Sequence, residues 1–229
     1  MPPTPGPPVH RNHTFIPPAF KPRLRGWLHL ATAPLTLAAG IVLIALSPTA
    51  ATRVGSAVYG LSAVLLFTVS AIFHRGRWSP RAQGLLRRFD HANIFLLIAG
   101  SYTPFTLLLL NGGERTTLLA VVWTAAVAGT LMRIFWLSAP RWLYTAVYVG
   151  LGWAAIFYIP SFTAAASTAV LVLMLIGGAL YTVGGVIYGL KRPNPSPTWF
   201  GFHEVFHALT IAAFIVHYVG ISIATYTLS

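Results

Sequence analysis

The chain alternates long runs of apolar residues with short polar connections. Each run has about the 20 residues that a helix needs to cross roughly 30 Å of hydrocarbon. Because lipid offers the backbone no hydrogen-bond partners, such runs are expected to be helical. The pattern predicts seven membrane-spanning helices, the fifth being the shortest, at about 26–48, 54–74, 89–111, 115–137, 141–160, 166–190 and 203–226.

The composition agrees with this pattern. Of the 229 residues, 56% are hydrophobic and 8% are charged, whereas about a quarter of the residues of a soluble domain are charged. The connections are short, and neither an inserted domain nor a convincing internal repeat is visible. We therefore expect an all-α integral membrane protein with one seven-transmembrane helix bundle over residues 26–229.

Residues 1–25 have a different character, because they are dense in proline and end in a basic cluster. Proline at this density favours an extended chain, so we expect a disordered cytoplasmic arm. No cleaved signal peptide is predicted, because the charged, apolar and small-residue regions of such a peptide do not follow one another here. His10 and His13 lie in this arm and are expected to be solvated.

The basic residues are distributed unevenly. Of the 15 lysines and arginines, only Arg53 and Arg115 lie in the odd-numbered connections, and all others lie in or beside the N-terminal arm and the even-numbered connections. This bias predicts a cytoplasmic N-terminus and, with an odd number of spans, a C-terminus outside. A net charge of +12 would suggest nucleic acid in a soluble chain, but here the cations set topology and contact anionic lipid headgroups. No nucleic-acid partner is expected.

Candidate chemistry begins at the start of the last apolar run, in Gly201-Phe202-His203-Glu204-Val205-Phe206-His207. Histidines four residues apart share one face of a helix and lie roughly 6 Å apart along its axis, so His203 and His207 can reach one metal ion. The chain has no cysteine, which leaves imidazole, carboxylate and water as ligands.

A third ligand is expected at the same depth in the membrane. His74 ends the second predicted helix and Asp90 begins the third, both on the cytoplasmic side with His203 and His207. Ionisable groups at membrane depth usually face the bundle interior. Three imidazoles with an open fourth position are typical of a catalytic zinc site. Asp90 would take a proton from bound water, whose pKa zinc lowers to roughly 7, and Ser70, one turn before His74, would donate a hydrogen bond to that water or to a developing oxyanion.

An alternative interpretation comes from the letters His203-Glu204-x-x-His207, which match a metalloprotease pattern with the glutamate as general base. A protease would need a third ligand downstream. Only His217 follows, and it lies about 15 Å along the helix from His207, so His74 is the better third ligand. A single histidine in a span is more often an interfacial or hydrogen-bonded residue than a metal ligand. We expect this of His29, His91 and His217.

Two further features concern packing. Pro104 in the third predicted helix removes a backbone hydrogen bond, and it either opens a lipid cavity by a kink or packs with small residues against a neighbour. The pairs Gly177-Gly178 and Gly184-Gly185 predict close helix contact in the sixth span.

Three spaced motifs resemble the hemolysin III family, the bacterial branch of the progestin and adipoQ receptors, from about residue 26 to the end. They are Ser70-Ala71-Ile72-Phe73-His74, then Phe89-Asp90-His91-Ala92-Asn93-Ile94 running into Ala99-Gly100-Ser101-Tyr102-Thr103-Pro104, and Gly201-Phe202-His203-Glu204-Val205-Phe206-His207.

The resemblance implies a multi-pass protein of the bacterial cell membrane, with a topology opposite to that of G-protein-coupled receptors. It implies zinc near the cytoplasmic face, held at positions matching His74, His203 and His207, with Ser70 and Asp90 beside the metal. Relatives in the wider superfamily include alkaline ceramidases, which hydrolyse a lipid amide bond.

Three functional hypotheses follow. The first is a zinc-dependent, ceramidase-like hydrolase of a membrane lipid amide or ester, acting in membrane homeostasis, with membrane lipids as partners and substrate. The second is a non-enzymatic sensor or receptor-like protein in which zinc ties the second and seventh helices together. The third, a pore-forming hemolysin, follows only from the family name, because no polar stripe runs through any span.

Overall fold

The structure, a computed structural model, describes residues 21–136 and 138–227. Most of the predicted proline-rich arm therefore lies outside the described residues. Within them the chain is helical, and its one β-bridge, between Ser196 and Phe200, is isolated. The elements are α1 (Trp27–Ala45), α2 (Ala50–Arg75), α3 (Pro80–Leu109), α4 (Gly112–Phe135), α5 (Arg141–Gly152), the 3-10 helix η1 (Ala154–Tyr158), α6 (Ile159–Ala165), α7 (Thr168–Leu190) and α8 (Phe202–Thr227).

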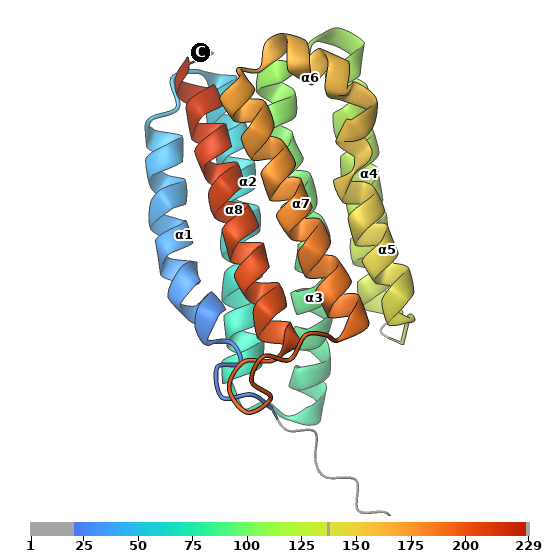
Figure 1. Ribbon diagram of the computed structural model, residues 1–229. Helices are drawn as coiled ribbons and strands as arrows, with labels where there is room; N and C mark the ends of the chain where they lie inside the picture. The colour runs from blue at the N-terminus through green and yellow to red at the C-terminus, as the bar shows by residue number, and fades with distance from the viewer. Residues whose placement is uncertain (1–20, 137, 228–229) are drawn as a thin grey trace, which may run out of the picture.

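Seven segments of the described chain are long and apolar enough to cross a membrane, which confirms the predicted seven-helix bundle (Figure 1). The fifth, Arg141–Ala165, combines α5, η1 and α6 and runs past the predicted end near residue 160. Pro160 does not stop it, because this proline lies in the first turn of α6, where its missing N–H costs no helical hydrogen bond.

The third span begins earlier than predicted. α3 starts at Pro80, not near residue 89, and so includes part of the basic second connection. The Ser79 side chain caps it by accepting a hydrogen bond from the Ala82 N–H, and Pro80 occupies the first turn. Capping therefore sets this end of the helix, while the apolar run marks only the part that can lie in lipid.

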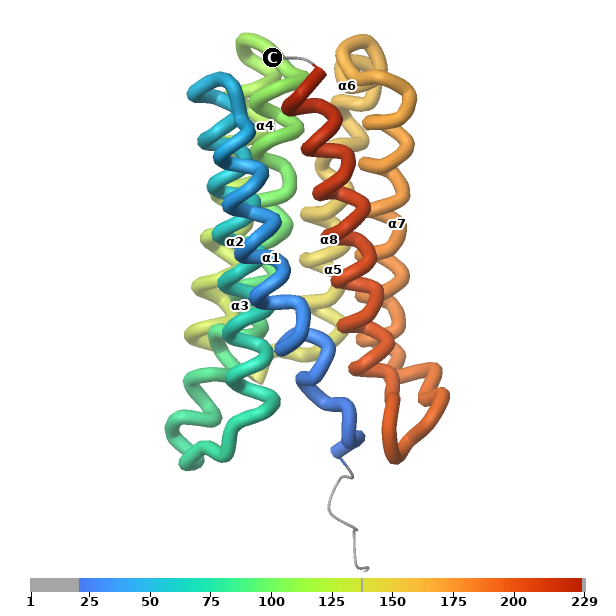
Figure 2. Tube along the Cα trace, turned by 90° about the vertical axis from the view of Figure 1, so that its left-hand side faces the viewer, coloured from blue at the N-terminus to red at the C-terminus, as the bar shows by residue number. Residues whose placement is uncertain are grey.

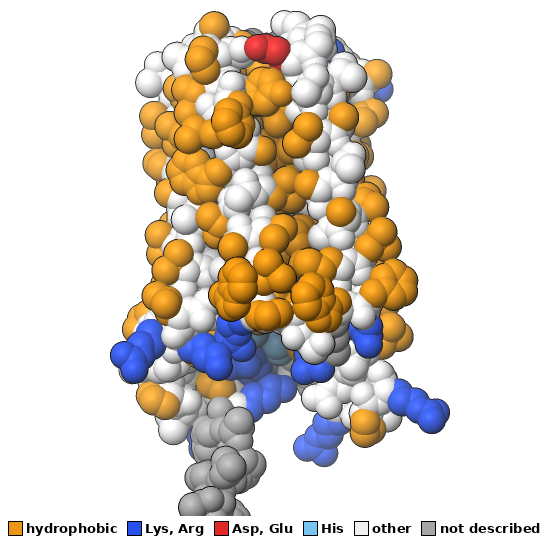
Figure 3. Space-filling view, turned by 90° about the vertical axis from the view of Figure 1, so that its right-hand side faces the viewer, with side chains coloured by type: hydrophobic (Ala, Val, Ile, Leu, Met, Phe, Trp, Pro, Cys, Tyr) orange, Lys and Arg blue, Asp and Glu red, His pale blue; other side chains and the backbone are white. Residues whose placement is uncertain are grey.

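The first and last described residues lie at opposite ends of the bundle. The first described residues share one end with the α2–α3, α4–α5 and α7–α8 connections, and the last residues of α8 lie at the other (Figures 1 and 2). On the face shown in Figure 3, lysine and arginine side chains gather at the first end, below a broad hydrophobic surface. This basic end is the one that the sequence predicts to face the cytoplasm.

Close packing of small residues joins α2 to α3. Gly55 of α2 lies against Pro104 of α3, and a Cβ atom at Gly55 would stand 2.9 Å from the Pro104 Cα. α3 continues through Pro104 to Leu109. Pro104 thus packs against a neighbouring helix, as one of its two interpretations predicts.

Three of the four glycines in the predicted pairs of α7 make close contacts, whereas no heavy atom lies within 4 Å of a Cβ at Gly178. A Cβ at Gly177 would strike the His217 ring of α8, and one at Gly184 would touch Leu209 of α8 at 3.4 Å. Gly185 faces Val149 of α5. α7 can thus approach α8 on one side and α5 on the other.

The Gly55 contact makes a testable prediction. The Gly55→Ala variant should lose about 1–3 kcal/mol of stability, because the new methyl group meets main-chain atoms of α3 that cannot rotate away. Denaturant or thermal unfolding of the purified protein measures this loss. Gly150→Ala is the matched control, since no heavy atom lies within 4 Å of a Cβ there. Equal stabilities of the two variants would contradict the packing described.

Candidate metal centre

Three histidines from two helices come together at the basic end of the bundle. His74 lies in the last turn of α2, and His203 and His207 occupy the first two turns of α8. One nitrogen from each ring lies within 4.8 Å of the others, with His74 and His207 buried and His203 half-buried. This group could hold a metal ion.

One pair of rings has a spacing that suits zinc. The Nε2 atoms of His74 and His203 are 3.2 Å apart, and two nitrogen ligands of a tetrahedral zinc ion lie about 3.3 Å apart when each is 2.0–2.1 Å from the metal. The two rings are nearly perpendicular, at 79°. A set of donors made entirely of imidazole nitrogens, with no thiolate in the chain, is within the range that zinc accepts.

Asp90 and Ser70 border the three-histidine group. The Asp90 Oδ2 atom is 3.6 Å from the His74 Nε2 atom. The Ser70 hydroxyl is buried one turn before His74 and lies beside the Asp90 carboxyl group. All five residues predicted for the site, from α2, α3 and α8, are thus within one small region.

His29 also belongs to this region, and sequence analysis had set it aside. Its ring stacks on the ring of His207, with centroids 3.7 Å apart and planes 10° from parallel. Both of its nitrogens are buried without a hydrogen-bond partner among the described residues. The sequence contained a signal that could have placed His29 in this region. His29 lies in the first turn of α1, at the same membrane depth as His203.

His91 is hydrogen-bonded, as we expect of a single histidine in a span. Its Nδ1 lies 2.7 Å from the carbonyl oxygen of Arg87, and its Nε2 lies 3.1 Å from the Tyr188 hydroxyl. Since a carbonyl only accepts, Nδ1 donates and Nε2 accepts from Tyr188. Both ring nitrogens are therefore used in hydrogen bonds.

Glu204 is bonded to groups outside the three-histidine group. Its Oε1 accepts a hydrogen bond from Arg25 in a buried ion pair, and its Oε2 accepts one from the Gly201 N–H at 2.9 Å. Glu204 does not line the cavity described below. With both oxygens engaged, Glu204 ties the segment before α1 to the start of α8, and the metalloprotease pattern loses its geometric support.

Lys21 makes a second link across the same end. Its Nζ donates to the His74 carbonyl oxygen at 2.6 Å. Partial burial, together with the charges of Arg25 and Arg75, holds the pKa of Lys21 below its ordinary value. The segment that precedes α1 thus bonds to α2 and to α8 beside the histidines.

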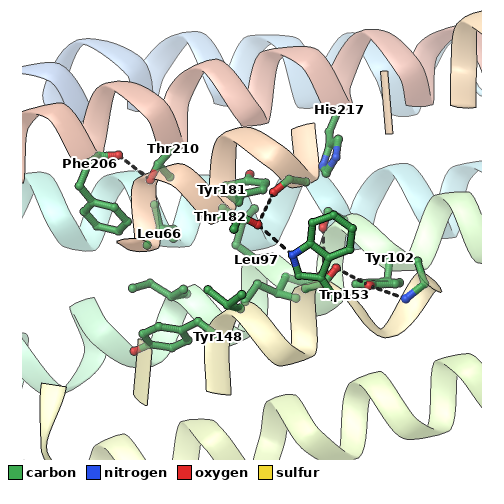
Figure 4. Close-up of a pocket in the computed structure, with 18 of the residues that line it drawn as sticks. Leu66, Leu97, Tyr102, Tyr148, Trp153, Tyr181, Thr182, Phe206, Thr210 and His217 are labelled. Carbon is green, nitrogen blue, oxygen red and sulfur yellow. Dashed lines mark hydrogen bonds between the residues drawn. The ribbon is translucent and has the colours of Figure 1, made fainter. Parts of the chain in front are cut away.

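One largely apolar cavity extends from the histidines into the bundle. Asp90, His203 and His207 line it, and so do Tyr181 and His217 (Figure 4). Its other walls come mainly from α3, α5 and α7. Several lining residues are also exposed on the outer surface, so the cavity reaches the lipid-facing surface between α5–α6 and α7; they are Trp153, Ile156, Ile159 and Leu175.

These features define a multi-pass helical membrane protein with a buried three-histidine group at one end of an apolar cavity. The family described as "Haemolysin-III related" matches residues 19–218. The chain therefore belongs to the hemolysin III family, as its motifs predicted.

Similar proteins agree with this membership. The chain is 36% identical to the "Hemolysin-3 homolog" of Bacillus subtilis (strain 168), over 63% of this chain and 68% of that protein. It is 37% identical to "Hemolysin-3" of Bacillus cereus, over 61% of this chain and 64% of that one. It is also 28% identical to an "Adiponectin receptor protein" of Drosophila melanogaster, over 71% of this chain but only 40% of the receptor.

The position of Glu204 predicts a structural effect of its removal. Glu204→Gln should cost about 1–3 kcal/mol, because Arg25 loses its charged partner, while bound metal should stay unchanged. Unfolding and metal content of the purified variant measure both, with Glu114→Gln as the control, since Glu114 is exposed. Loss of metal at unchanged stability would instead assign Glu204 to the metal site.

Proposed function

We propose that this protein is a zinc-dependent hydrolase of an amide or ester bond in a membrane lipid. The observation that supports this proposal best is the position of Asp90, whose carboxylate borders three clustered imidazoles at one end of an apolar cavity. A structural zinc site is normally closed by four protein ligands. Three histidines with a carboxylate and a cavity beside them favour catalysis.

In this mechanism His74, His203 and His207 would hold a zinc ion, which would supply Lewis acidity towards the substrate carbonyl and towards water. Asp90 accepts the proton of the attacking water and returns it to the leaving amine or alcohol. The buried Ser70 hydroxyl donates a hydrogen bond to the carbonyl oxygen as negative charge develops on it.

The cavity explains why the substrate would be a lipid. Its walls are largely apolar, and residues that line it reach the lipid-facing surface between α5–α6 and α7. An acyl chain can enter from the membrane without crossing water and leave its carbonyl beside Asp90 and the histidines. The wider superfamily implied by the family resemblance includes alkaline ceramidases, which supports the same class of substrate.

The distribution of basic residues supports the cellular arrangement that we propose. The basic end, which carries the histidines, faces the cytoplasm of a bacterial cell, and the C-terminus lies outside. The reaction would then take place at the cytoplasmic side of the cell membrane. We propose membrane lipids as the partners and no nucleic acid.

One observation favours a second function. His74 lies on α2, and His203 and His207 lie on α8, so a metal ion would cross-link the two helices whether or not a reaction occurs. In that case the protein is a membrane sensor with structural zinc. Removing the metal would then lower the unfolding temperature, and replacing Asp90 or Ser70 would change no lipid.

Substitutions at Asp90, Ser70 and His207 separate these functions. Asp90→Asn should keep the metal and lose turnover about 10²- to 10⁴-fold, because no base remains. Ser70→Ala should keep the metal and lose roughly 10²-fold. His207→Ala should lose both metal and turnover. Lipid analysis of cells that express each variant finds the substrate, and assays on purified protein then give the rates.

Ser62→Ala is the matched control, because Ser62 is a buried serine of α2 that does not line the cavity. It should behave as the unmodified protein does. Normal turnover by purified Asp90→Asn protein would rule out Asp90 as the base. Identical lipid profiles in cells with intact and His207→Ala protein would favour the sensor.

A further inference from the structure

A pair of polar side chains lies in the cavity, away from the three histidines. Tyr181 of α7 and His217 of α8 have ring centroids 5.6 Å apart, and both line the cavity (Figure 4). The Tyr181 hydroxyl and the His217 Nδ1 atom are buried and have no hydrogen-bond partner among the described residues. Buried polar atoms normally have a partner, so these two call for a ligand.

Neighbouring polar groups of the same cavity are already bonded. The Trp153 Nε1 donates to the Thr182 hydroxyl at 3.0 Å, and that hydroxyl donates to the Gly178 carbonyl at 2.8 Å. The Tyr102 hydroxyl donates to the Gly152 carbonyl at 2.7 Å and accepts from the Ala155 N–H. The other lining residues with a buried, unpartnered side-chain atom among the described residues are His29, Ser70 and Thr145. His29 and Ser70 belong to the three-histidine end and Thr145 lies on α5, so Tyr181 and His217 form a separate pair on α7 and α8.

The protonation of His217 follows from its other nitrogen. Its Nε2 lies 3.2 Å from the Met174 carbonyl oxygen, which can only accept, so Nε2 carries the proton. In the neutral ring Nδ1 is then an acceptor, while the Tyr181 hydroxyl can donate or accept. An alcohol matches this pair, because its O–H donates to Nδ1 and its oxygen accepts from Tyr181. A ketone satisfies only Tyr181, and a methylene group satisfies neither.

The chain is built to hold the His217 ring in this place. A Cβ at Gly177 would stand 2.1 Å from the His217 Cδ2 atom, so only glycine leaves room for the ring. On another side the Phe105 ring packs edge-on against it, with centroids 5.7 Å apart. With its ring fixed by neighbours and by the Met174 carbonyl, His217 has a preset direction for Nδ1.

The distance between the three histidines and the Tyr181–His217 pair determines where on a lipid the alcohol would lie. His207 and His217 are ten residues apart on α8, which corresponds to about 15 Å along the helix. An extended chain advances about 1.2 Å per covalent bond, as in an extended polypeptide. The two sites are thus roughly a dozen bonds apart.

We propose that Tyr181 and His217 form a hydroxyl-binding subsite, selecting a lipid whose acyl chain carries an alcohol about a dozen bonds from its carbonyl. The position of the carbonyl rests on the proposed function. The preference for an alcohol does not need turnover, so it is tested by binding alone.

The experiment is isothermal titration of the purified full-length protein with four probes. They are octadecanoic acid and its 2-hydroxy, 12-hydroxy and 12-oxo derivatives. The 12-hydroxy acid should bind roughly 5- to 50-fold more tightly than octadecanoic acid, because two hydrogen bonds are gained. The 12-oxo acid should fall between them, and the 2-hydroxy acid should match octadecanoic acid.

Substitutions assign the preference to the two residues. Tyr181→Phe and His217→Phe should each reduce the preference for the 12-hydroxy acid at least severalfold and leave the affinity for octadecanoic acid nearly unchanged. Tyr102→Phe is the matched control, because the Tyr102 hydroxyl is already bonded, and it should keep the preference.

Equal binding of the 12-hydroxy and unsubstituted acids by the unmodified protein, or no binding of either, overturns the subsite. This ranking needs no variant, so misfolding of a variant cannot obscure it. A preserved preference in a protein without turnover would refute the hydrolase and leave the subsite standing. Turnover without any preference for the 12-hydroxy acid would refute the subsite and leave the hydrolase standing.

Discussion

The approach of α2 and α8 at the basic end is the contact on which the rest of the site depends. It brings His74 to His203 and His207, with His29 of α1 stacked on the last of these. So many imidazoles in a buried position are costly unless their nitrogens are bonded. A shared cation satisfies three of them at once, and it would join the first turns of α8 to the end of α2.

The polar links around this end hold the segment before α1 in place. Arg25 and Lys21 reach Glu204 and the His74 backbone, so this segment crosses the ends of α2 and α8. The cavity extends from the three histidines towards Tyr181 and His217. A lipid in this cavity would meet reactive groups at one position and an alcohol-binding pair at another.

Hydropathy alone predicted the spans, because length and apolar composition decide what can cross a membrane. It could not predict that α3 starts at Pro80, since a cap sets that end. Residue depth predicted that His74 and Asp90 meet His203 and His207, because the four share one side of the bundle. The helical rotation of Glu204 towards Arg25, and the room that Gly177 makes for His217, depend on how neighbouring helices pack. The sequence pattern does not contain that information.

X-ray absorption at the zinc edge, on protein purified without added metal, tests the three-histidine centre most directly. We expect about one zinc ion per chain, with imidazole nitrogens at about 2.0–2.1 Å. The His74→Ala variant should lose this signal or replace one nitrogen with oxygen. Protein that contains no zinc, or a zinc spectrum that is the same with and without His74, would contradict the metal centre.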